Sequence, residues 1–294
     1  MGRGESLGVP FGQYNIDGII GRGANATVFR ASHRDGSDPV ALKVLRSIGQ
    51  EGEILSETGL RESFIHASLQ HPHILGYRSY GVYYGNGKPE PYHVLELAPH
   101  GSVADEITKS GEISMPKVVN YTMQTARAVE EVHREGFLHL DIKLGNVLLV
   151  GHHVKLADFG SSQCNTVATQ NFIECAPQYI APERANQGRI SEQTDVYAAG
   201  GVMPYRLATG RFPIHADSVD GYMDACQTDE PPTFEQVLGR DMTMWHEALE
   251  GPVMRALSKR PEDRHEGMGH YVEDITTNMA QVINKHKAVV IDLR

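Results

Sequence analysis

A change of pattern near residue 100 constrains the fold of this chain more than any other feature of its sequence. Before that point, short apolar runs are separated by glycine-rich or Asp/Gly turns, a pattern typical of β-strands. We expect strands over residues 14–21, 27–32, 40–45, 75–83 and 92–97, and one helix over residues 51–69. The first hundred residues therefore predict a sheet with a single main helix.

After residue 101 the apolar periodicity becomes helical. Ser114 and Pro116 are typical of a helix start, and the stripe that follows consists of Val119, Met123, Ala126, Val129 and Val132. Further helical patterns cover residues 191–209, 244–258 and 265–284, and a turn-rich segment at residues 98–101 separates the two parts. The sequence predicts an α+β fold of two lobes with a cleft between them: a small β-rich lobe and a larger, mostly helical lobe.

The composition limits the partners and the environment of the chain. The formal net charge is −10 over 294 residues and the pI is near 5.8, so no broad basic surface is available for nucleic acid. The longest apolar runs, such as residues 147–150, are too short to span a bilayer. The three cysteines lack the spacing of a metal site, as in a reduced protein. We expect a cytoplasmic protein with no transmembrane segment and no nucleic-acid partner.

A glycine-rich segment at residues 21–28 lies between two expected strands. Gly21 and Gly23 allow the backbone to turn tightly and to bring its N–H groups close to phosphate oxygens. The segment continues into a strand rather than opening a helix, which disfavours a dinucleotide site. On its own, this segment is equally consistent with an ordinary hairpin turn.

Lys43 ends the run Val40-Ala41-Leu42-Lys43 on the third expected strand. A lysine among apolar neighbours is costly unless its ammonium meets an anion. Alternation along the strand places Ala41 and Lys43 on the same face, so a face that covers an adenine would also present a cation to its phosphates. Glu62 on the expected helix can pair with Lys43, although two unrelated surface residues are the plainer alternative. The combination with the upstream glycine-rich segment favours a phosphate site.

Three motifs in the second part carry the most specific signal. Residues 139–146 have the sequence HLDIKLGN, residues 158–160 are DFG, and residues 181–183 are APE. In this order and at these spacings they resemble the catalytic loop, the metal-binding motif and the end of the activation segment of protein kinases. The resemblance covers residues 14–274, and residues 21–30 and 252–261 are most similar to bacterial Hanks-type (eukaryotic-like) Ser/Thr kinases.

The resemblance implies an ATP- and Mg²⁺-dependent protein kinase that transfers the γ-phosphate to Ser or Thr hydroxyls of protein substrates and that autophosphorylates. It places the kinase N-lobe at residues 14–98, the C-lobe at residues 99–285, and tails at residues 1–13 and 286–294. A free-standing kinase, one domain of a longer protein and an effector delivered into another cell are all compatible with the sequence. The sequence does not indicate an oligomeric state.

The resemblance also implies roles for individual residues. The catalytic residues are Asp141, Lys143, Lys43 and Glu62, and the Mg²⁺ ligands are Asn146 and Asp158. Asp141 would accept the proton of the acceptor hydroxyl, and Lys143 would neutralise charge on the transferred group. Amide and carboxylate oxygens are ligands that Mg²⁺ prefers. As structural supports, Asp195 would hold the catalytic-loop backbone and Arg264 would pair with Glu183.

The nucleotide-binding residues implied by the same resemblance are Ile20, Gly21, Gly23, Val28, Ala41, Lys43, Glu96, Ala98, Ser102 and Leu148. The apolar side chains among them would enclose the adenine, as pockets of this kind require. The backbone of Glu96 and Ala98 would make the hydrogen bonds to the adenine. Core packing is the alternative explanation for the four apolar residues.

Two positions depart from the family pattern. Leu140 occupies the place of an arginine that usually binds a phosphorylated residue of the activation segment, and Ala176 occupies the place of a threonine that usually links the catalytic Asp and Lys. Thr166 and Thr169 lie mid-way along the segment, where autophosphorylation is expected. Because Leu140 offers no charge to a phosphate, we expect phosphorylation of Thr166 and Thr169 to add little activity.

Two other functions remain open from the sequence. A small-molecule kinase of the aminoglycoside or choline type shares the ATP-binding half and a similar catalytic loop, but the APE motif and Arg264 disfavour it. A pseudokinase scaffold is disfavoured because Lys43, Asp141 and Asp158 are all present.

Overall fold

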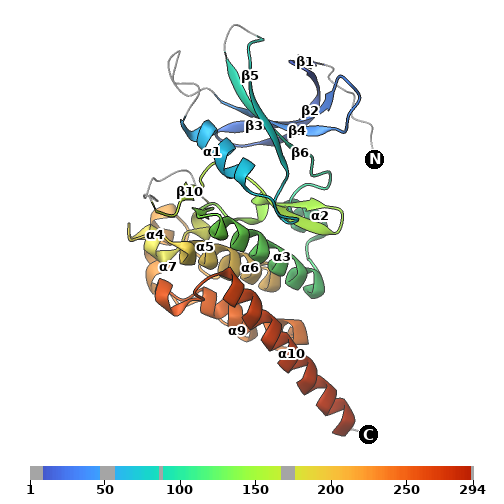
Figure 1. Cartoon of the computed structure of the whole chain (residues 1–294). Helices are drawn as coiled ribbons and strands as arrows, with labels where there is room; N and C mark the ends of the chain where they lie inside the picture. The colour runs from blue at the N-terminus through green and yellow to red at the C-terminus, as the bar shows by residue number, and fades with distance from the viewer. Residues whose placement is uncertain (1–8, 47–56, 86–88, 167–175, 293–294) are drawn as a thin grey trace. The chain divides into compact units, whose positions relative to one another are not determined.

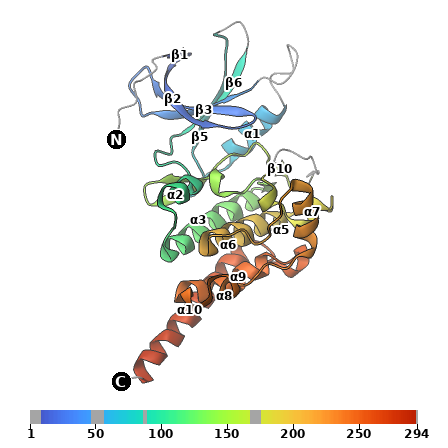
Figure 2. The same ribbon diagram turned by 180° about the vertical axis from the view of Figure 1, so that it is seen from behind.

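The computed structural model describes residues 9–46, 57–85, 89–166 and 176–292 (Figures 1 and 2). The chain divides into two compact units. Unit 1 comprises Met1–Gln70 and Ile74–Pro99, and unit 2 comprises His71–His73 and His100–Arg294. His71–His73 belong with unit 2 because His73 O accepts a hydrogen bond from Leu156 N at 2.8 Å. The predicted order of a β-rich part followed by a helical part is confirmed.

Unit 1 contains a six-stranded antiparallel sheet in the order β1-β2-β3-β4-β6-β5. Its elements are β1 (Val9–Phe11), β2 (Tyr14–Arg22), β3 (Ala26–His33), β4 (Val40–Leu45), α1 (Glu57–Ser68), β5 (Tyr77–Tyr83) and β6 (Glu90–Glu96). The prediction for β4 is matched residue for residue, and the other predicted strands of this sheet differ from their predicted bounds by one or two residues at one or both ends. The predicted beginning of the helix, at residues 51–56, lies outside the described residues.

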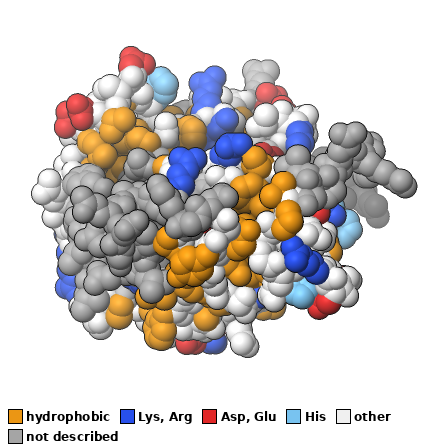
Figure 3. Space-filling model, turned by 90° about the horizontal axis from the view of Figure 1, so that it is seen from above, with side chains coloured by type: hydrophobic (Ala, Val, Ile, Leu, Met, Phe, Trp, Pro, Cys, Tyr) orange, Lys and Arg blue, Asp and Glu red, His pale blue; other side chains and the backbone are white. Residues whose placement is uncertain are grey.

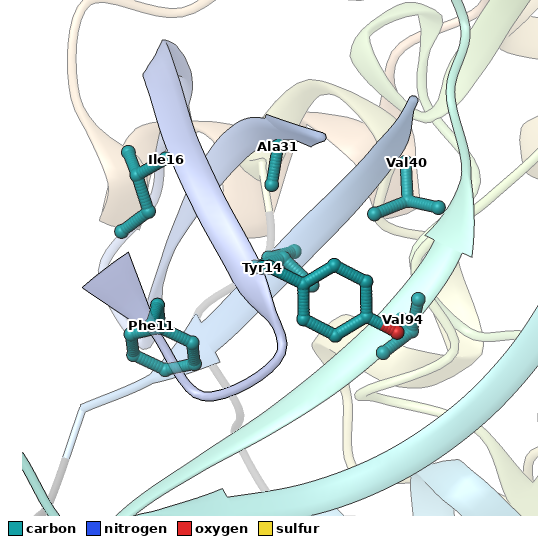
Figure 4. Close-up of a cluster of buried hydrophobic side chains, with 7 residues drawn as sticks. Phe11, Tyr14, Ile16, Ala31, Val40 and Val94 are labelled. Atoms are coloured by element: carbon teal, nitrogen blue, oxygen red, sulfur yellow. The ribbon is translucent and has the colours of Figure 1, made fainter. Parts of the chain in front are cut away.

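Strand β1 was not predicted, and it lies within residues 1–13, which the sequence analysis assigned to a tail. It pairs with β2 through the tight turn at Gly12, whose φ is +57°. Phe11 is buried, and its ring lies 4.2 Å from Tyr83 and 5.1 Å from Tyr92 between centroids. Figure 4 shows Phe11 beside Tyr14 and Ile16 in the buried cluster of this sheet. A strand of three residues is too short for alternation to reveal, so only the aromatic contacts identify it.

Unit 2 is mostly helical, with two small two-stranded sheets. Its strands are β7 (Phe137–Leu138), β8 (Val147–Val150), β9 (His153–Leu156) and β10 (Gln163–Cys164). Its longer helices are α2 (Val103–Ser110), α3 (Met115–Arg134), α7 (Val219–Thr228), α9 (Met244–Ala256) and α10 (Met268–Asp292). The short helices and turns are η1 (Leu144–Asn146), η2 (Pro177–Tyr179), α4 (Pro182–Ala185), α5 (Glu192–Val196), η3 (Tyr197–Val202), α6 (Met203–Thr209), α8 (Phe234–Leu238), η4 (Gly239–Asp241) and η5 (Pro261–Asp263).

Helix α3 begins after Ser114, as predicted, and buries the predicted stripe residues Ala126, Val129 and Val132. The predicted helix over residues 191–209 is a continuous rod of α5, η3 and α6, in which η3 is a π-helical segment. A Cβ at Gly201 would lie 2.7 Å from a side-chain carbon of Leu257, so the close packing of this rod requires glycine there.

Helix α10 extends to Asp292, beyond its predicted end at residue 284, and so occupies most of the predicted tail at residues 286–294. Lys285 and His286 lie within ion-pair distance of Glu247 on α9, so the first residues beyond the predicted end contact α9. None of the helices in the described ranges is long and apolar enough to cross a membrane. On the face drawn in Figure 3, Lys and Arg side chains lie among hydrophobic and uncharged ones.

Candidate active site

Lys43 and Glu62 form an ion pair within unit 1. Lys43 Nζ lies 2.5 Å from Glu62 Oε1, and the two side chains are 12% and 5% exposed. Strand β4 supplies the lysine and α1 supplies the glutamate, as the sequence predicted. In such a poorly hydrated setting a charge-assisted hydrogen bond holds both groups in one geometry. The lysine is therefore fixed in orientation by the helix.

Two buried histidines surround this pair, and sequence reasoning gave neither a part in it. His93 pairs with Lys43 across β4 and β6, and its Nε2 lies 3.9 Å from Glu62 Oε2. One turn after Glu62, His66 Nε2 lies 2.7 Å from Leu75 O. Burial lowers the pKa of His66 to about 4, so this ring is neutral near pH 7. Cross-strand pairing, which no local pattern reveals, brings His93 to the carboxylate.

The glycine-rich segment forms the hairpin between β2 and β3. Gly21 pairs with Val28 across the strands, and Gly23 N donates to Ala26 O at 2.9 Å. Val28 pairs in turn with Lys43 on β4. Ile20 is 50% exposed, which makes an apolar surface available at the edge of the hairpin. Ala41 is buried on β4.

The remaining predicted nucleotide-binding residues have clear local roles. Glu96 N donates to Gly76 O at 2.8 Å, and its carboxylate accepts from Gly76 N at 2.9 Å. Ala98 follows the end of β6. Ser102 caps α2 in a reciprocal capping box with Asp105 and forms an isolated β-bridge with Leu148. The Ser102 side chain therefore stabilises the start of α2, whatever else it contacts.

Asp141, Lys143 and Asn146 meet in the catalytic loop of unit 2. Asp141 Oδ2 accepts from Lys143 Nζ at 2.7 Å and from Asn146 Nδ2 at 3.0 Å. Asn146 Nδ2 also donates to Asp141 O at 2.8 Å. The three predicted residues thus form one hydrogen-bonded group. Both amide hydrogens of Asn146 point to Asp141, which leaves the amide oxygen as an available metal ligand.

Asp195 holds the start of this loop through hydrogen bonds to its backbone. Its carboxylate accepts from His139 N at 2.7 Å and from Leu140 N at 2.8 Å, and His133 Nε2 lies 2.9 Å from the same group. Burial alone would raise the pKa of Asp195, but hydrogen bonding and charge from His133 and His139 hold it below its ordinary value. Asp195 is therefore a carboxylate that fixes two consecutive backbone amides, as the resemblance implied.

Asp158 lies next to the same loop. Its φ is +68°, and Phe159 after it is fully buried with its ring 5.0 Å from the ring of His139. Ala157 N donates to Asn146 O at 2.9 Å, which ties the segment before Asp158 to the catalytic loop. The amide of Asn146 and the carboxylate of Asp158 fit a hard cation such as Mg²⁺, which takes few protein ligands and completes its shell with phosphate and water. The described residues contain no cluster of three or more His, Cys, Asp or Glu side chains suited to a metal.

The comparisons with known proteins agree with this geometry. The sequence model of the protein kinase domain matches residues 14–273. The chain belongs to the protein kinase family. The chain is 28% identical over 277 residues to a probable serine/threonine-protein kinase of Clostridium acetobutylicum, a match that covers 92% of this chain and 41% of the relative.

Other bacterial kinases are similarly related. The serine/threonine-protein kinase PksC of Streptomyces coelicolor is 31% identical over 275 residues, covering 90% of this chain and 48% of the relative. The probable serine/threonine-protein kinase PknB of Lactococcus lactis is 28% identical over 271 residues, covering 90% and 42%. The chain thus spans less than half the length of these relatives. The resemblance to bacterial Hanks-type kinases is confirmed.

The end of the kinase activation segment is anchored by a buried ion pair. Both oxygens of Glu183 accept from Arg264, at 2.9 and 2.8 Å, and Thr194 Oγ1 donates to Glu183 Oε1 at 2.9 Å. The predicted pair of Glu183 and Arg264 is therefore present. Residues 167–175, which include Thr169, lie outside the described residues.

Sequence reasoning missed two residues that join this segment to the catalytic loop. Tyr179 OH accepts a hydrogen bond from Leu144 N at 3.5 Å, and burial raises the pKa of Tyr179 to about 12. Arg184 Nη1 donates to Leu140 O at 2.6 Å. Arg184 directly follows the APE motif, so its position was visible, but no pattern indicated the direction of its side chain.

Proposed function

We propose that this chain is an ATP- and Mg²⁺-dependent protein kinase that phosphorylates Ser or Thr hydroxyls. The observation that carries the proposal is the Asp141 carboxylate, which is oriented through Oδ2 by Lys143 at 2.7 Å and Asn146 at 3.0 Å. A carboxylate held through one oxygen presents the other to an acceptor hydroxyl. The serine/threonine-kinase names of the relatives support the same assignment.

In this mechanism Asp141 orients the acceptor hydroxyl and accepts its proton as the oxygen bonds to the γ-phosphorus and the bond to the ADP oxygen breaks. Phosphoryl transfer requires mainly positioning and charge neutralisation from the protein. Lys143, beside Asp141, neutralises charge on the transferred group. This lysine also favours a short Ser or Thr acceptor, because its ammonium can contact the acceptor oxygen and the phosphate together.

Nucleotide and metal are held by the other predicted residues. Lys43, oriented by Glu62, would bind the α- and β-phosphates, and Asn146 and Asp158 would supply oxygen ligands to Mg²⁺. When bound, Mg²⁺ neutralises phosphate charge. Ile20, Val28, Ala41 and Leu148 provide the apolar contacts to the adenine.

The test is a radiolabelled transfer assay with Mg-ATP and casein, on the wild-type chain and the variants Asp141→Asn and Asp158→Ala. We expect Asp141→Asn to retain ATP binding but to lose about a thousandfold or more in kcat, and Asp158→Ala to lose metal-dependent turnover. Asp217→Asn is the matched control, because the Asp217 side chain is fully exposed. Near-full activity of Asp141→Asn would show that the catalytic assignment is wrong.

The same assay separates the alternatives. Label on choline or aminoglycoside but not on protein would identify a small-molecule kinase, and ATP binding without any transfer would identify a pseudokinase. Phosphoamino-acid analysis of the autophosphorylated chain is expected to give phosphoserine or phosphothreonine. Predominant phosphotyrosine would overturn the acceptor assignment.

A further inference from the structure

We infer that Arg184 is a positioning residue that holds the Asp141 peptide in place for the proposed phosphoryl transfer. Arg184 Nη1 donates to Leu140 O at 2.6 Å. That carbonyl belongs to the same planar peptide group as the amide nitrogen of Asp141. A guanidinium bonded to one end of the plane therefore restrains the backbone from which the Asp141 carboxylate projects.

The restrained peptide follows a residue in an unfavourable conformation. Leu140 has a φ of +64°, in the left-handed region that a branched side chain rarely adopts. Such a conformation persists only where its surroundings impose it. Asp195 fixes Leu140 from its N–H side, and the Leu140 side chain packs against Leu138 and Ile190. Arg184 is the contact that fixes the carbonyl side.

The fold restricts the position of the Arg184 backbone. It lies in α4 immediately after Glu183, which is itself held by Arg264 and Thr194. Within the described residues, no carboxylate lies within ion-pair distance of the Arg184 guanidinium. Its charge is therefore directed to the carbonyl, a charge-assisted hydrogen bond that is stronger than a neutral one.

A water is the replacement that the surroundings offer for this donor. A cavity of about 10 Å³ adjoins the contact and is lined in part by Leu140, Asp141, Ala176 and Arg184. A space of that size admits about one water molecule. After loss of the guanidinium, such a water could donate to the Leu140 carbonyl, but it carries no charge and is not attached to α4, so the peptide would be held less firmly.

The consequence is a link from the end of the activation segment to the catalytic aspartate that requires no charge at position 140. Leu140 cannot reach into the activation segment with a polar group. Instead of an arginine at position 140 that binds the activation segment, Arg184 at the end of that segment donates to the backbone of the catalytic loop. Misplacement of a reacting group by about 1 Å can lower a rate by about a hundredfold.

The test compares wild type, Arg184→Met and Arg184→Lys, with Arg255→Met on α9 as the control for loss of an exposed arginine. Arg184→Met is expected to lower kcat by about tenfold to a hundredfold while KM for Mg-ATP changes by less than about twofold. Arg184→Lys keeps a charged donor, so its kcat should exceed that of Arg184→Met by about threefold or more. A kcat of Arg184→Met within about twofold of wild type would overturn the inference.

Hydrogen exchange supplies a readout that does not depend on activity. In Arg184→Met we expect faster exchange of the peptide that spans residues 137–144, with unchanged exchange in α9 and little change in Tm. Unchanged exchange at residues 137–144 would overturn the inference, as would equal acceleration throughout unit 2. Because the inference rests on the proposed function, the wild-type assay decides between the two failures: an inactive wild type counts against the function, whereas an active wild type with an unaffected Arg184→Met counts against Arg184 alone.

Discussion

Unit 1 has a largely buried pair of Lys43 and Glu62, unit 2 has a buried pair of Arg264 and Glu183, and the two pairs are built differently. In unit 2, Arg264 is fully buried and all five of its N–H groups have acceptors: two oxygens of Glu183 and the carbonyls of Gln193, Ser258 and Lys259. In unit 1, Lys43 keeps 12% exposure, and its partner Glu62 has a second basic neighbour, His93 at 3.9 Å. In the Arg264–Glu183 pair, protein atoms accept from every N–H group of the arginine. In the Lys43–Glu62 pair, the lysine is partly accessible and the glutamate has a histidine as a second neighbour.

This difference indicates different uses of buried charge. A guanidinium with every donor satisfied by fixed protein atoms has nothing left to bind, so its contribution is to hold the activation segment in place. Breaking a buried pair is costly because the remaining charge has no water to solvate it. A lysine that remains partly accessible beside a shared carboxylate is suited to contact a phosphate, which is the role proposed for Lys43.

The largest expected effect is on stability, from Arg264→Met compared with Lys43→Met. Arg264→Met leaves Glu183 buried and should lower the free energy of unfolding by about 3–5 kcal/mol. Lys43→Met should cost clearly less stability, because Lys43 is 12% exposed and Glu62 keeps His93 at 3.9 Å as a basic neighbour, but it should abolish most phosphoryl transfer. Urea denaturation and the transfer assay on both variants measure the two effects. Equal losses of stability would contradict the comparison.

The second expected effect is a pH dependence of stability that His66 of unit 1 causes. The pKa of His66 is lowered to about 4 by burial, so the unfolded chain binds a proton between pH 6.5 and pH 4 that the folded chain does not. Stability from this group is therefore complete above about pH 6.5 and is lost as the pH falls. Between pH 7 and pH 5 the loss amounts to about 2 kcal/mol.

His66→Gln keeps a donor for Leu75 O but cannot be protonated in this range, so its stability should fall less between pH 7 and pH 5. Urea denaturation at the two pH values gives the difference between wild type and variant. His215→Gln is the control in unit 2, because the His215 side chain is 90% exposed. Parallel pH dependences of wild type and His66→Gln would mean that His66 does not carry this loss.

The elements that motifs and periodicity indicate could be predicted from the sequence, whereas those that depend on tertiary contacts could not. The strand at residues 40–45 and the start of α3 at Ser114 follow from alternation and capping signals. The short strand β1 depends on the packing of Phe11 against the rings of Tyr83 and Tyr92, which lie far along the chain, and no local pattern reveals these contacts.

The same limit applies to the site. The group formed by Asp141, Lys143 and Asn146 lies within one loop motif, so its members could be named in advance. His93 reaches Glu62 through cross-strand pairing, and Arg184 reaches Leu140 across 44 residues of sequence. Side-chain direction after long chain separations is set by packing rather than by neighbours in sequence.

The smallest expected effect is that of phosphorylation in the activation segment. Thr166 Oγ1 lies 3.3 Å from Cys164 Sγ, and Thr169 lies outside the described residues. Leu140 is buried against Leu138 and Ile190 and offers no charge to a phosphate, while Arg184 is engaged with the Leu140 carbonyl. Neither Leu140 nor Arg184 is therefore available as a cationic partner for a phosphate on Thr166, and the contacts of Arg184 and Asp195 with the backbone of Leu140 do not depend on such a phosphate.

Thr166→Ala/Thr169→Ala, phosphatase-treated wild type and untreated wild type should accordingly show rates within about twofold of one another in the transfer assay. Phosphopeptide mapping of the untreated enzyme checks that the threonines are modified at all. A rate that falls tenfold or more without the phosphates, about 1.4 kcal/mol in the activation barrier, would contradict the prediction. It would mean that another basic residue, such as Lys155 or the exposed Arg189, binds the phosphate and that unit 2 carries a charge switch in addition to its saturated ion pair.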